Sequence, residues 1–264
     1  SQDAGAAGVF TLPRDLRGPF HMTRLLNGIV ALGSVLLLAV TLIGAGFAAV
    51  AIPDAATATL SRAFSGCDQP NTPFTTDELA SMAIAGKHYT FDDNDREKLD
   101  AAIAEANAAA EADGRANALS RESAARTLPT DAISHLDDVY RVASVAKPAL
   151  VIVAVLCIAG LAHVAVRISR RALGRTLMAG GGLVLAAFCA LGAWAAIDFD
   201  GLFAAFHSLF FQAGTWTFPY DSLLITLYPT AFWMGMGGIW LAVTCGLSIL
   251  AVLIGFTLGH KQHD

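Results

Sequence analysis

Four long segments of the chain are almost entirely apolar, and they constrain the fold more than any other feature. They are residues 25–51, 148–166, 177–197 and 232–258. A helix needs about 20 apolar residues to cross the hydrocarbon core of a bilayer, and each segment has about that length or more. The sequence therefore predicts an all-α integral membrane protein with four transmembrane helices.

The composition of the whole chain agrees with this class. Hydrophobic residues make up 55% of the sequence and charged residues 15%, and the mean hydropathy is +0.55. Ordinary globular domains are far less apolar. The formal net charge is −5, and the sequence contains no basic surface large enough to neutralise nucleic-acid phosphates. We therefore expect no nucleic-acid partner.

Basic residues predict the orientation of the four helices. The short connection 167–176 contains four arginines, whereas the connection 198–231 contains neither lysine nor arginine. Because lysine and arginine accumulate in short cytoplasmic loops, 167–176 is predicted to be cytoplasmic. The N-terminal segment 1–24 and the tail 259–264 then lie on the same side, and the connections 52–147 and 198–231 face the outside.

The outer segment 52–147 is predicted to be a largely helical domain. Helical spacing begins after Thr75 or Thr76, either of which can cap the helix. Residues 92–126 are rich in Ala, Glu, Asp and Arg, which are adequate to strong helix formers with few large apolar anchors. We expect one or two exposed helices there, interrupted at Gly114.

A further helix is predicted over residues 128–142, and it carries a histidine between two acids. Pro129 marks its start, and apolar residues recur at helical spacing. Asp131 and Asp138 lie four residues before and three residues after His135, so the three side chains share one helical face. A carboxylate one turn from an imidazole can fix its tautomer and stabilise the imidazolium. A surface histidine on a polar face fits the same spacing.

The connection 198–231 contains a second histidine among aromatic residues. A helical apolar face too short to span a bilayer predicts an interfacial or re-entrant helix. Its members are Phe199, Leu202, Phe203, Phe206, Leu209 and Phe210. His207 lies beside this face, and Trp216 continues the aromatic belt expected at headgroup level. A lone histidine here is either a packing residue or a proton-transfer group, and an ionisable group at membrane depth favours a functional role.

The two histidine motifs resemble those of the lipoprotein intramolecular transacylase (Lit) family. They are His135-Leu136-Asp137-Asp138-Val139 and Phe206-His207 with Phe210, Phe211 and Trp216, followed by Pro229 at the last helix. Members of that family are bacterial four-helix membrane proteins of about this size, with both motifs on the outer side. The resemblance extends from about Leu25 to the last helix. Residues 92–126 look longer than is typical for the family, so no function carries over to them.

The resemblance implies an acyltransferase in the bacterial cytoplasmic membrane, with both termini inside and the active site on the outer face. Such enzymes take a diacylated lipoprotein whose N-terminal cysteine bears a diacylglyceryl group. They move the sn-2 acyl chain to the α-amine of the same cysteine, which gives the lyso-form lipoprotein. Donor and acceptor belong to one molecule in contact with membrane lipid, so we expect neither an acyl-enzyme nor a cofactor nor a metal.

The resemblance also implies roles for individual residues. His135 and His207 are the expected acid–base pair, and the sequence leaves open which of them is the base. Asp138 is the expected orienting group for His135, with Asp131 as the alternative. Weaker candidates for substrate contacts are Tyr140, Ser208, Trp216, Phe206 and Phe210.

Two other classes of function fit the same residues. His135, His207 and Asp138 could bind zinc in a membrane metalloenzyme, since zinc sites use histidine and carboxylate ligands. Alternatively, the protein could be a non-enzymatic helper or sensor whose outer domain binds another protein. The sequence predicts neither the preferred lipoprotein and acyl chain, nor the role of residues 92–126, nor the oligomeric state.

Overall fold

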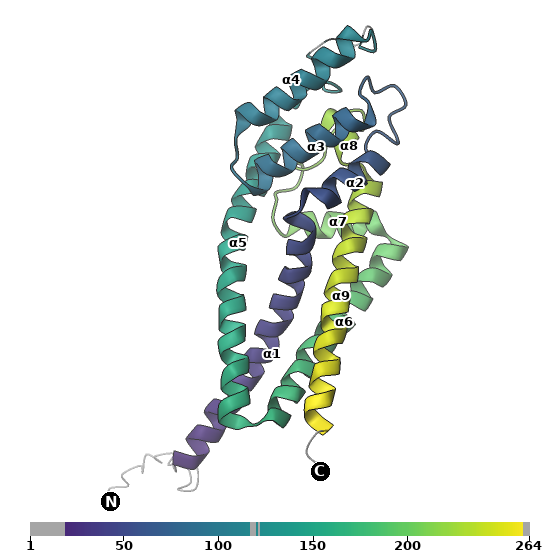
Figure 1. Ribbon diagram of the computed structural model, residues 1–264. Coiled ribbons are helices and arrows are strands. Elements are labelled where there is room, and N and C mark those ends of the chain that lie inside the picture. Colours follow the sequence, from purple (N-terminus) through teal and green to yellow (C-terminus); the bar gives the residue numbers. More distant parts are fainter. Residues whose placement is uncertain (1–18, 117–119, 121, 261–264) are drawn as a thin grey trace, which may run out of the picture.

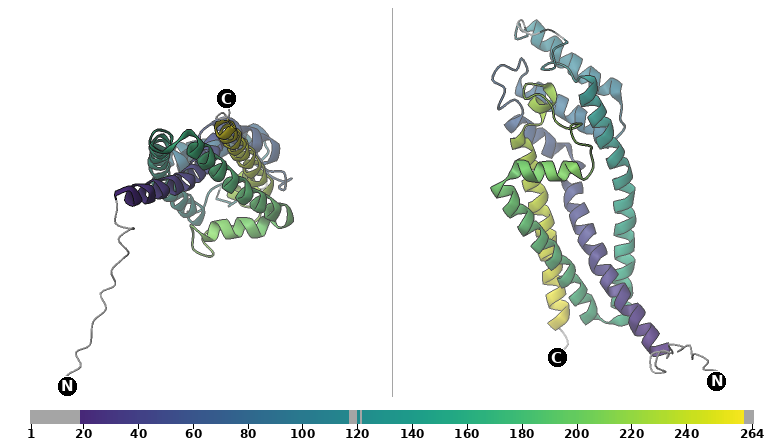
Figure 2. Two further views of the ribbon diagram at one scale, coloured as in Figure 1. Left: turned by 90° about the horizontal axis from the view of Figure 1, so that it is seen from below. Right: turned by 180° about the vertical axis from the view of Figure 1, so that it is seen from behind.

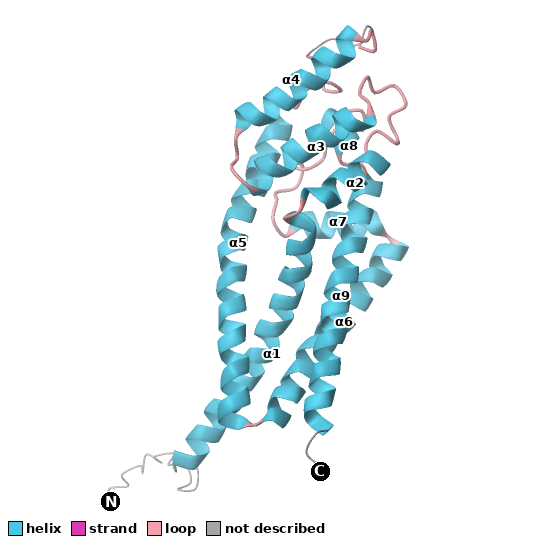
Figure 3. Ribbon diagram, in the orientation of Figure 1, coloured by secondary structure: helices cyan, strands magenta, loops and turns pink. Residues whose placement is uncertain are grey.

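The computed structural model describes residues 19–116, 120 and 122–260. Most of the predicted segment 1–24 and residues 261–264 of the predicted tail lie outside the described residues. Within the described part, all regular structure is helical (Figure 3). Four long helices run side by side (Figure 1), and each is long and apolar enough to cross a membrane. They are α1 (Pro19–Ala51), α5 (Thr130–His163), α6 (Arg170–Ile197) and α9 (Thr230–His260). The predicted fold class is confirmed.

The start of α1, the α5–α6 connection and the end of α9 lie at one end of this bundle (Figure 1). The connection consists of a short π-helix, η2 (Val164–Ile168), and Ser169. Ser169 caps α6, because its hydroxyl oxygen accepts a hydrogen bond from the Ala172 N–H at 3.0 Å. The predicted loop 167–176 is therefore shorter than expected, since the cap starts the next helix at Arg170.

The second predicted span is part of a longer helix. Helix α5 begins at Thr130, directly after Pro129, and continues through Pro148. The predicted helix over residues 128–142 and the predicted span 148–166 are thus one element. At about 1.5 Å per residue, a helix of 34 residues is much longer than a bilayer core is thick. Its first turns can therefore belong to the helical domain at the other end of the bundle, which we call the outer domain after its predicted position.

Four shorter helices form the opposite end of the molecule (Figure 1). They are α2 (Asp54–Phe64), α3 (Thr76–Phe91), α4 (Arg96–Ala112) and α8 (Leu223–Leu227). Thr75 begins α3 with a capping box: its hydroxyl accepts from the Glu78 N–H at 3.3 Å, and the Glu78 carboxylate accepts from the Thr75 N–H at 2.7 Å. Thr75 rather than Thr76 is therefore the cap.

Helix α4 is less exposed than its composition predicts. It ends just before Gly114, whose φ of +69° favours glycine, so the predicted interruption is confirmed. One face of α4, however, belongs to the core of the outer domain. The buried residues of that face are Leu99, Ile103, Ala106 and Ala110. Alanine is small enough to let helices approach closely, and a scarcity of large apolar side chains therefore does not imply an exposed helix.

A short helix, α7 (Phe199–Ser208), lies across the long helices next to the outer domain (Figure 2). It follows α6 directly, and the Asp198 carboxylate caps it by accepting from the Gly201 N–H at 2.8 Å. A Cβ at position 201 would lie 2.0 Å from an Asp198 carboxylate oxygen, so a larger residue there would require the Asp198 side chain to shift. The cap thus turns the chain sharply at the end of α6, and α7 carries His207 toward the start of α5.

Candidate functional site

His135 lies in the second turn of α5, where the helix is anchored in the outer domain. Its neighbours Ala132, Ile133 and Leu136 belong to the buried core of that domain. The histidine itself is 9% exposed. Two rings surround its imidazole: the Phe211 centroid lies 5.0 Å from the His135 centroid and the Phe218 centroid 5.6 Å from it. His135 is therefore a buried residue and not a surface histidine on a polar face.

His207 lies in the last turn of α7 and is also 9% exposed. Its Nδ1 is 2.9 Å from the Phe203 carbonyl oxygen. The Phe203 and Trp216 rings pack against the imidazole, with centroid distances of 4.0 Å and 4.8 Å. The bond to Phe203 fixes the orientation of the His207 ring within an aromatic enclosure.

The fold brings the two histidines together although they come from distant parts of the sequence. Their ring centroids are 6.2 Å apart, and the ring planes are inclined by 28°. Phe211 contacts both imidazoles, at 5.0 Å from His135 and 5.7 Å from His207. The pairing of His135 and His207 that the motifs predict is present in the structure.

The hydrogen bond and the burial of His207 determine its chemical state. A carbonyl oxygen can only accept, so Nδ1 carries the proton in this bond. In the neutral imidazole the other nitrogen, Nε2, then has a free lone pair. Burial lowers the pKa of His207 below 6.5, and the bond to the Phe203 carbonyl opposes this only in part. At neutral pH the ring is therefore an uncharged base whose available atom is Nε2.

Two polar atoms at this site are buried without a hydrogen-bond partner among the described residues: His135 Nδ1 and Trp216 Nε1. Both belong to rings that contact the His207 ring. Buried polar groups in folded proteins almost always have partners. Unpaired polar atoms on two neighbours of one histidine are typical of a site that receives a polar ligand.

An open groove of about 710 Å³ lies beside the histidine pair. Helix α5 forms one wall, and the segment after α7 forms the other. The lining residues are Asp138, Arg141, Val142, Val145, Ala146, Phe210, Phe211, Gln212 and Thr215. Phe211 is part of this wall and also contacts both histidines. The groove is mainly apolar, and Val145 and Phe210 are exposed on its rim.

The predicted orienting acids do not reach His135. The Asp138 carboxylate accepts a hydrogen bond from Arg141 Nη1 at 2.8 Å, and His135 Nδ1 has no partner. Asp131 is exposed, and its carboxylate accepts from the Ala132 N–H at 2.9 Å. Both acids occupy the predicted helical face, but in this structure neither fixes the tautomer of His135.

The weaker candidates have mixed positions. Phe206 contacts the His207 ring at 5.8 Å, and Phe210 contacts the Phe206 ring at 5.2 Å, so both belong to the aromatic surroundings of the site. The Ser208 hydroxyl donates to the Ala205 carbonyl at 2.7 Å and is already used within the helix end. Tyr140 is half-buried on α5, and within the described part of the chain no hydrogen bond or ring contact connects it to either histidine. The motifs indicated no role for Phe218 or Arg141, because the positions of both side chains depend on how the loop folds against α5.

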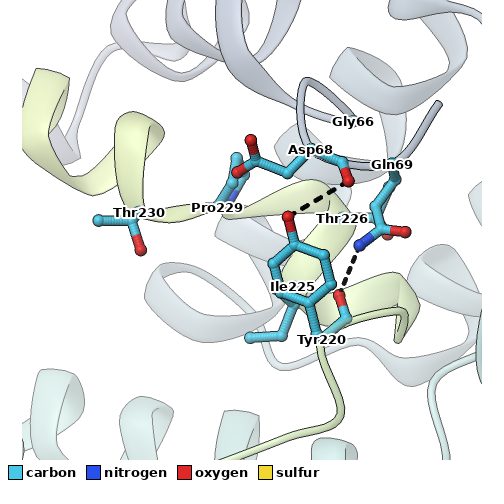
Figure 4. A pocket seen from close by; sticks show the side chains of 8 residues that line it. All are labelled: Gly66, Asp68, Gln69, Tyr220, Ile225, Thr226, Pro229 and Thr230. Atoms are coloured by element: carbon cyan, nitrogen blue, oxygen red, sulfur yellow. Dashed lines mark hydrogen bonds between the residues drawn. The ribbon is translucent and has the colours of Figure 1, made fainter.

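A second, smaller cavity of about 70 Å³ lies where the loop before α8 meets the segment after α2 (Figure 4). There Gln69 Nε2 donates to the Tyr220 carbonyl at 2.9 Å, and the Tyr220 hydroxyl donates to the Asp68 carbonyl at 3.3 Å. These bonds connect the loop that carries Trp216 and Phe218 to the outer domain. The residues around this cavity therefore help to hold the loop of the histidine site in place, and no histidine lines the cavity within the described residues.

Within the described ranges, no group of three or more His, Cys, Asp or Glu side chains is arranged to share a metal ion. The predicted zinc set of His135, His207 and Asp138 is not such a group. Asp138 instead bonds to Arg141. The metalloenzyme alternative consequently has no ligand set in this part of the chain.

Comparisons with known proteins agree with this site. The family model "Lipoprotein intramolecular transacylase Lit" matches residues 113–233, just under half of the chain and including both histidines. No curated protein matches in sequence. The solved structure of the membrane integral lipoprotein intramolecular transacylase Lit from Bacillus cereus is 17% identical with a TM-score of 0.67, covering 90% of this chain and 98% of that one.

A variant of the Bacillus cereus protein, with one histidine replaced by alanine, has a TM-score of 0.65 at 17% identity and covers 93% of this chain and 99% of its own. At this identity the solved structures establish the fold. The region that the family model matches contains both His135 and His207. This protein is therefore similar to the lipoprotein intramolecular transacylase (Lit) family over residues 113–233, and it shares the fold of the Bacillus cereus Lit structure.

Proposed function

We propose that His135 and His207 of this acyltransferase catalyse the transfer of the sn-2 acyl chain of a diacylglyceryl-cysteine lipoprotein to its α-amine. The observation that carries the proposal is the buried pair itself, with ring centroids 6.2 Å apart beside a groove of about 710 Å³. The product is the lyso-form lipoprotein. The reaction is an isomerisation, so it consumes no water and requires no second substrate.

His207 has the properties of the general base. The α-amine has a pKa of about 7.7–8.0 and must lose a proton to become and remain a nucleophile. Nε2 of neutral His207 accepts the proton as the amine nitrogen attacks the ester carbonyl carbon. The C–O bond to the glyceryl oxygen then breaks, and that oxygen takes up a proton. His135, the adjacent imidazole, can relay to this oxygen the proton that His207 accepted, so that both rings end the cycle neutral.

The groove beside the histidine pair is the place where the acyl chains of the substrate would bind. Val145 and Phe210 on its rim are exposed, as expected for a surface in contact with acyl chains in a bilayer. Because amine and ester are tethered in one molecule, the site mainly has to align them and exclude water. A covalent acyl-enzyme is therefore unnecessary.

We also propose that the site lies on the outer face of the bacterial membrane and that both termini are cytoplasmic. The start of α1, the end of α9 and the α5–α6 connection share one end of the bundle, and four arginines lie in this connection and the first turns of α6. The histidine pair lies toward the other end, next to the outer domain. Arginine-rich short connections are retained in the cytoplasm. Cysteine labelling from outside the cell at the α3–α4 connection tests this orientation.

The test uses purified full-length protein in detergent micelles with a synthetic diacylglyceryl lipopeptide that has a free α-amine. Fragmentation in a mass spectrometer should show the acyl chain on nitrogen with no change in total mass. His135→Ala and His207→Ala are each expected to lower the rate by about 10²–10⁴-fold, the usual contribution of acid–base catalysis. His260→Gln, an exposed histidine at the end of α9, is the matched control.

Two results would overturn the proposal. Absence of N-acylation by the folded wild-type protein would exclude the reaction. Full activity of both alanine variants would exclude the roles of the histidines and would favour a chemistry located elsewhere in the molecule.

A further inference from the structure

The indole nitrogen of Trp216 is a hydrogen-bond donor with an unexplained position. It is buried and has no partner among the described residues. An indole N–H can donate one hydrogen bond and cannot accept any. Packing alone does not require it, because phenylalanine would make similar ring contacts without burying a polar atom.

The Trp216 ring is firmly placed beside the base. Its centroid lies 4.8 Å from that of His207 and 6.4 Å from that of Phe203. The turn before it is closed by hydrogen bonds from the Thr215 N–H and hydroxyl to the Gln212 carbonyl, at 3.2 and 2.9 Å. Gly214 permits this turn by adopting a φ of +85°.

The other end of the loop is fixed as well. The bonds of Tyr220 to Gln69 and Asp68 attach it to the outer domain. The Trp216 N–H is therefore a preorganised donor, held from both sides with its nitrogen buried. Donors of this kind are most effective where negative charge develops during a reaction.

The proposed chemistry supplies one such charge. When the amine nitrogen attacks the ester, the carbonyl oxygen becomes an oxyanion. His207 cannot stabilise it through Nδ1, because that proton is already donated to Phe203. Nor is the Ser208 hydroxyl available, since it donates to Ala205. Of the atoms around the His207 ring, the Trp216 N–H is a donor without an acceptor.

We propose that Trp216 is a catalytic residue whose indole N–H donates a hydrogen bond to the carbonyl oxygen of the sn-2 ester and holds the oxyanion of the tetrahedral intermediate. The assignment rests on the transacylation proposed above. It adds no bond-making step, because the hydrogen bond forms as the C=O bond becomes a C–O⁻ bond and is released when the carbonyl re-forms in the amide.

The experiment combines activity, binding and spectroscopy. Trp216→Phe keeps the ring and removes the donor, and its kcat is expected to fall by about 10²-fold, as for loss of one oxyanion donor. Trp233→Phe is the matched control, since Trp233 also contacts the Phe203 ring, at 6.0 Å, but is 38% exposed. This control should retain wild-type activity.

Two analogues of the lipopeptide separate a catalytic role from a structural one. In the first, a tetrahedral phosphonate replaces the sn-2 ester, and in the second an ether replaces it. Trp216→Phe should weaken binding of the phosphonate by about 10–100-fold and leave binding of the ether analogue unchanged, because only the phosphonate mimics the oxyanion.

In the wild-type protein, NMR of ¹⁵N-labelled indoles provides a readout that does not depend on any variant folding. The chain contains 4 tryptophans, and the Trp216 signal is the one absent from Trp216→Phe. The phosphonate should shift this proton downfield, and the ether should not. An active wild type with an unshifted Trp216 signal and equal phosphonate binding by Trp216→Phe would overturn the assignment, whereas an inactive wild type would refute transacylation itself.

Discussion

The contact between α6 and α9 provides a sharp test of the packing of the bundle. The two helices approach so closely at Gly174 and Gly255 that the backbone of one touches the other. A Cβ at position 255 would lie 2.5 Å from the Gly174 carbonyl oxygen and 2.8 Å from Met178 Cγ. A Cβ at position 174 would lie 2.6 Å from the Gly255 carbonyl oxygen. Neither neighbour can rotate away, because the nearest atom in each case is backbone.

The variant Gly255→Ala should therefore destabilise the protein. Inserting a methyl group into a packed interface typically costs about 1–3 kcal/mol. Alanine regains up to about 1 kcal/mol through its higher helix propensity. The expected net loss is about 1–2 kcal/mol. Gly246→Ala on the same helix is the matched control, since a Cβ there meets nothing within 4 Å and the position is exposed. We expect it to be neutral or stabilising.

Thermal unfolding in detergent micelles, followed by tryptophan fluorescence, measures the difference. At roughly 2–4 °C per kcal/mol for a chain of this size, Gly255→Ala should melt several degrees below Gly246→Ala. Gly174→Ala should behave like Gly255→Ala, and the double variant should lose less than the sum of both, because separating the helices once relieves both clashes. Equal melting temperatures for Gly255→Ala and Gly246→Ala would refute the inferred contact.

Three further outcomes follow from the structure. Activity should rise with pH up to about pH 8, because the proposed reaction requires a neutral His207 and a deprotonated α-amine, and burial places the pKa of His207 below 6.5. A pH–rate profile that falls above pH 6.5 would contradict this prediction. The unfolding free energy should decline as the pH falls below about 6.5 toward the folded-state pKa of His207, because the unfolded chain takes up the proton first. Melting temperatures measured between pH 7 and pH 5 should show a shallower decline for His207→Gln than for the wild type. Arg126→Ala should lower the unfolding free energy by about 3 kcal/mol, because the side chain is only 2% exposed and its guanidinium donates hydrogen bonds to Asn107 and Glu111 at 2.7 Å each. Chemical denaturation measures this loss, and a value below about 1 kcal/mol would contradict the prediction.

The sequence predicted the membrane helices well because length and hydropathy suffice to identify them. Other features depended on packing that no local pattern encodes. Composition suggested an exposed helix over residues 96–112, but alanines such as Ala106 and Ala110 are buried. Thr75 and Thr76 were equivalent as caps in the sequence, and only the reciprocal bonds with Glu78 distinguish them.

The candidate site was predictable to a similar extent. Two short motifs indicated His135 and His207, because each placed an imidazole at the predicted outer end of a membrane helix. The orienting role of Asp138 stays a prediction. Helical spacing allows its carboxylate to reach either His135 or Arg141, and in this structure it accepts from the exposed Arg141, while its charge still acts on the His135 imidazole. The contribution of Phe218 could not be foreseen because it depends on the path of a long loop.

The position of the apolar groove determines which concentration controls the reaction rate. In the proposed reaction, a lipid-anchored substrate would reach the rim at Val145 and Phe210 by diffusion within the bilayer, not from the aqueous phase. The relevant variable is then the mole fraction of lipoprotein among the surrounding lipids or detergent molecules. Adding inert detergent at a fixed amount of lipopeptide should slow turnover by surface dilution, and a rate that depended only on the bulk concentration would point to a different route of entry.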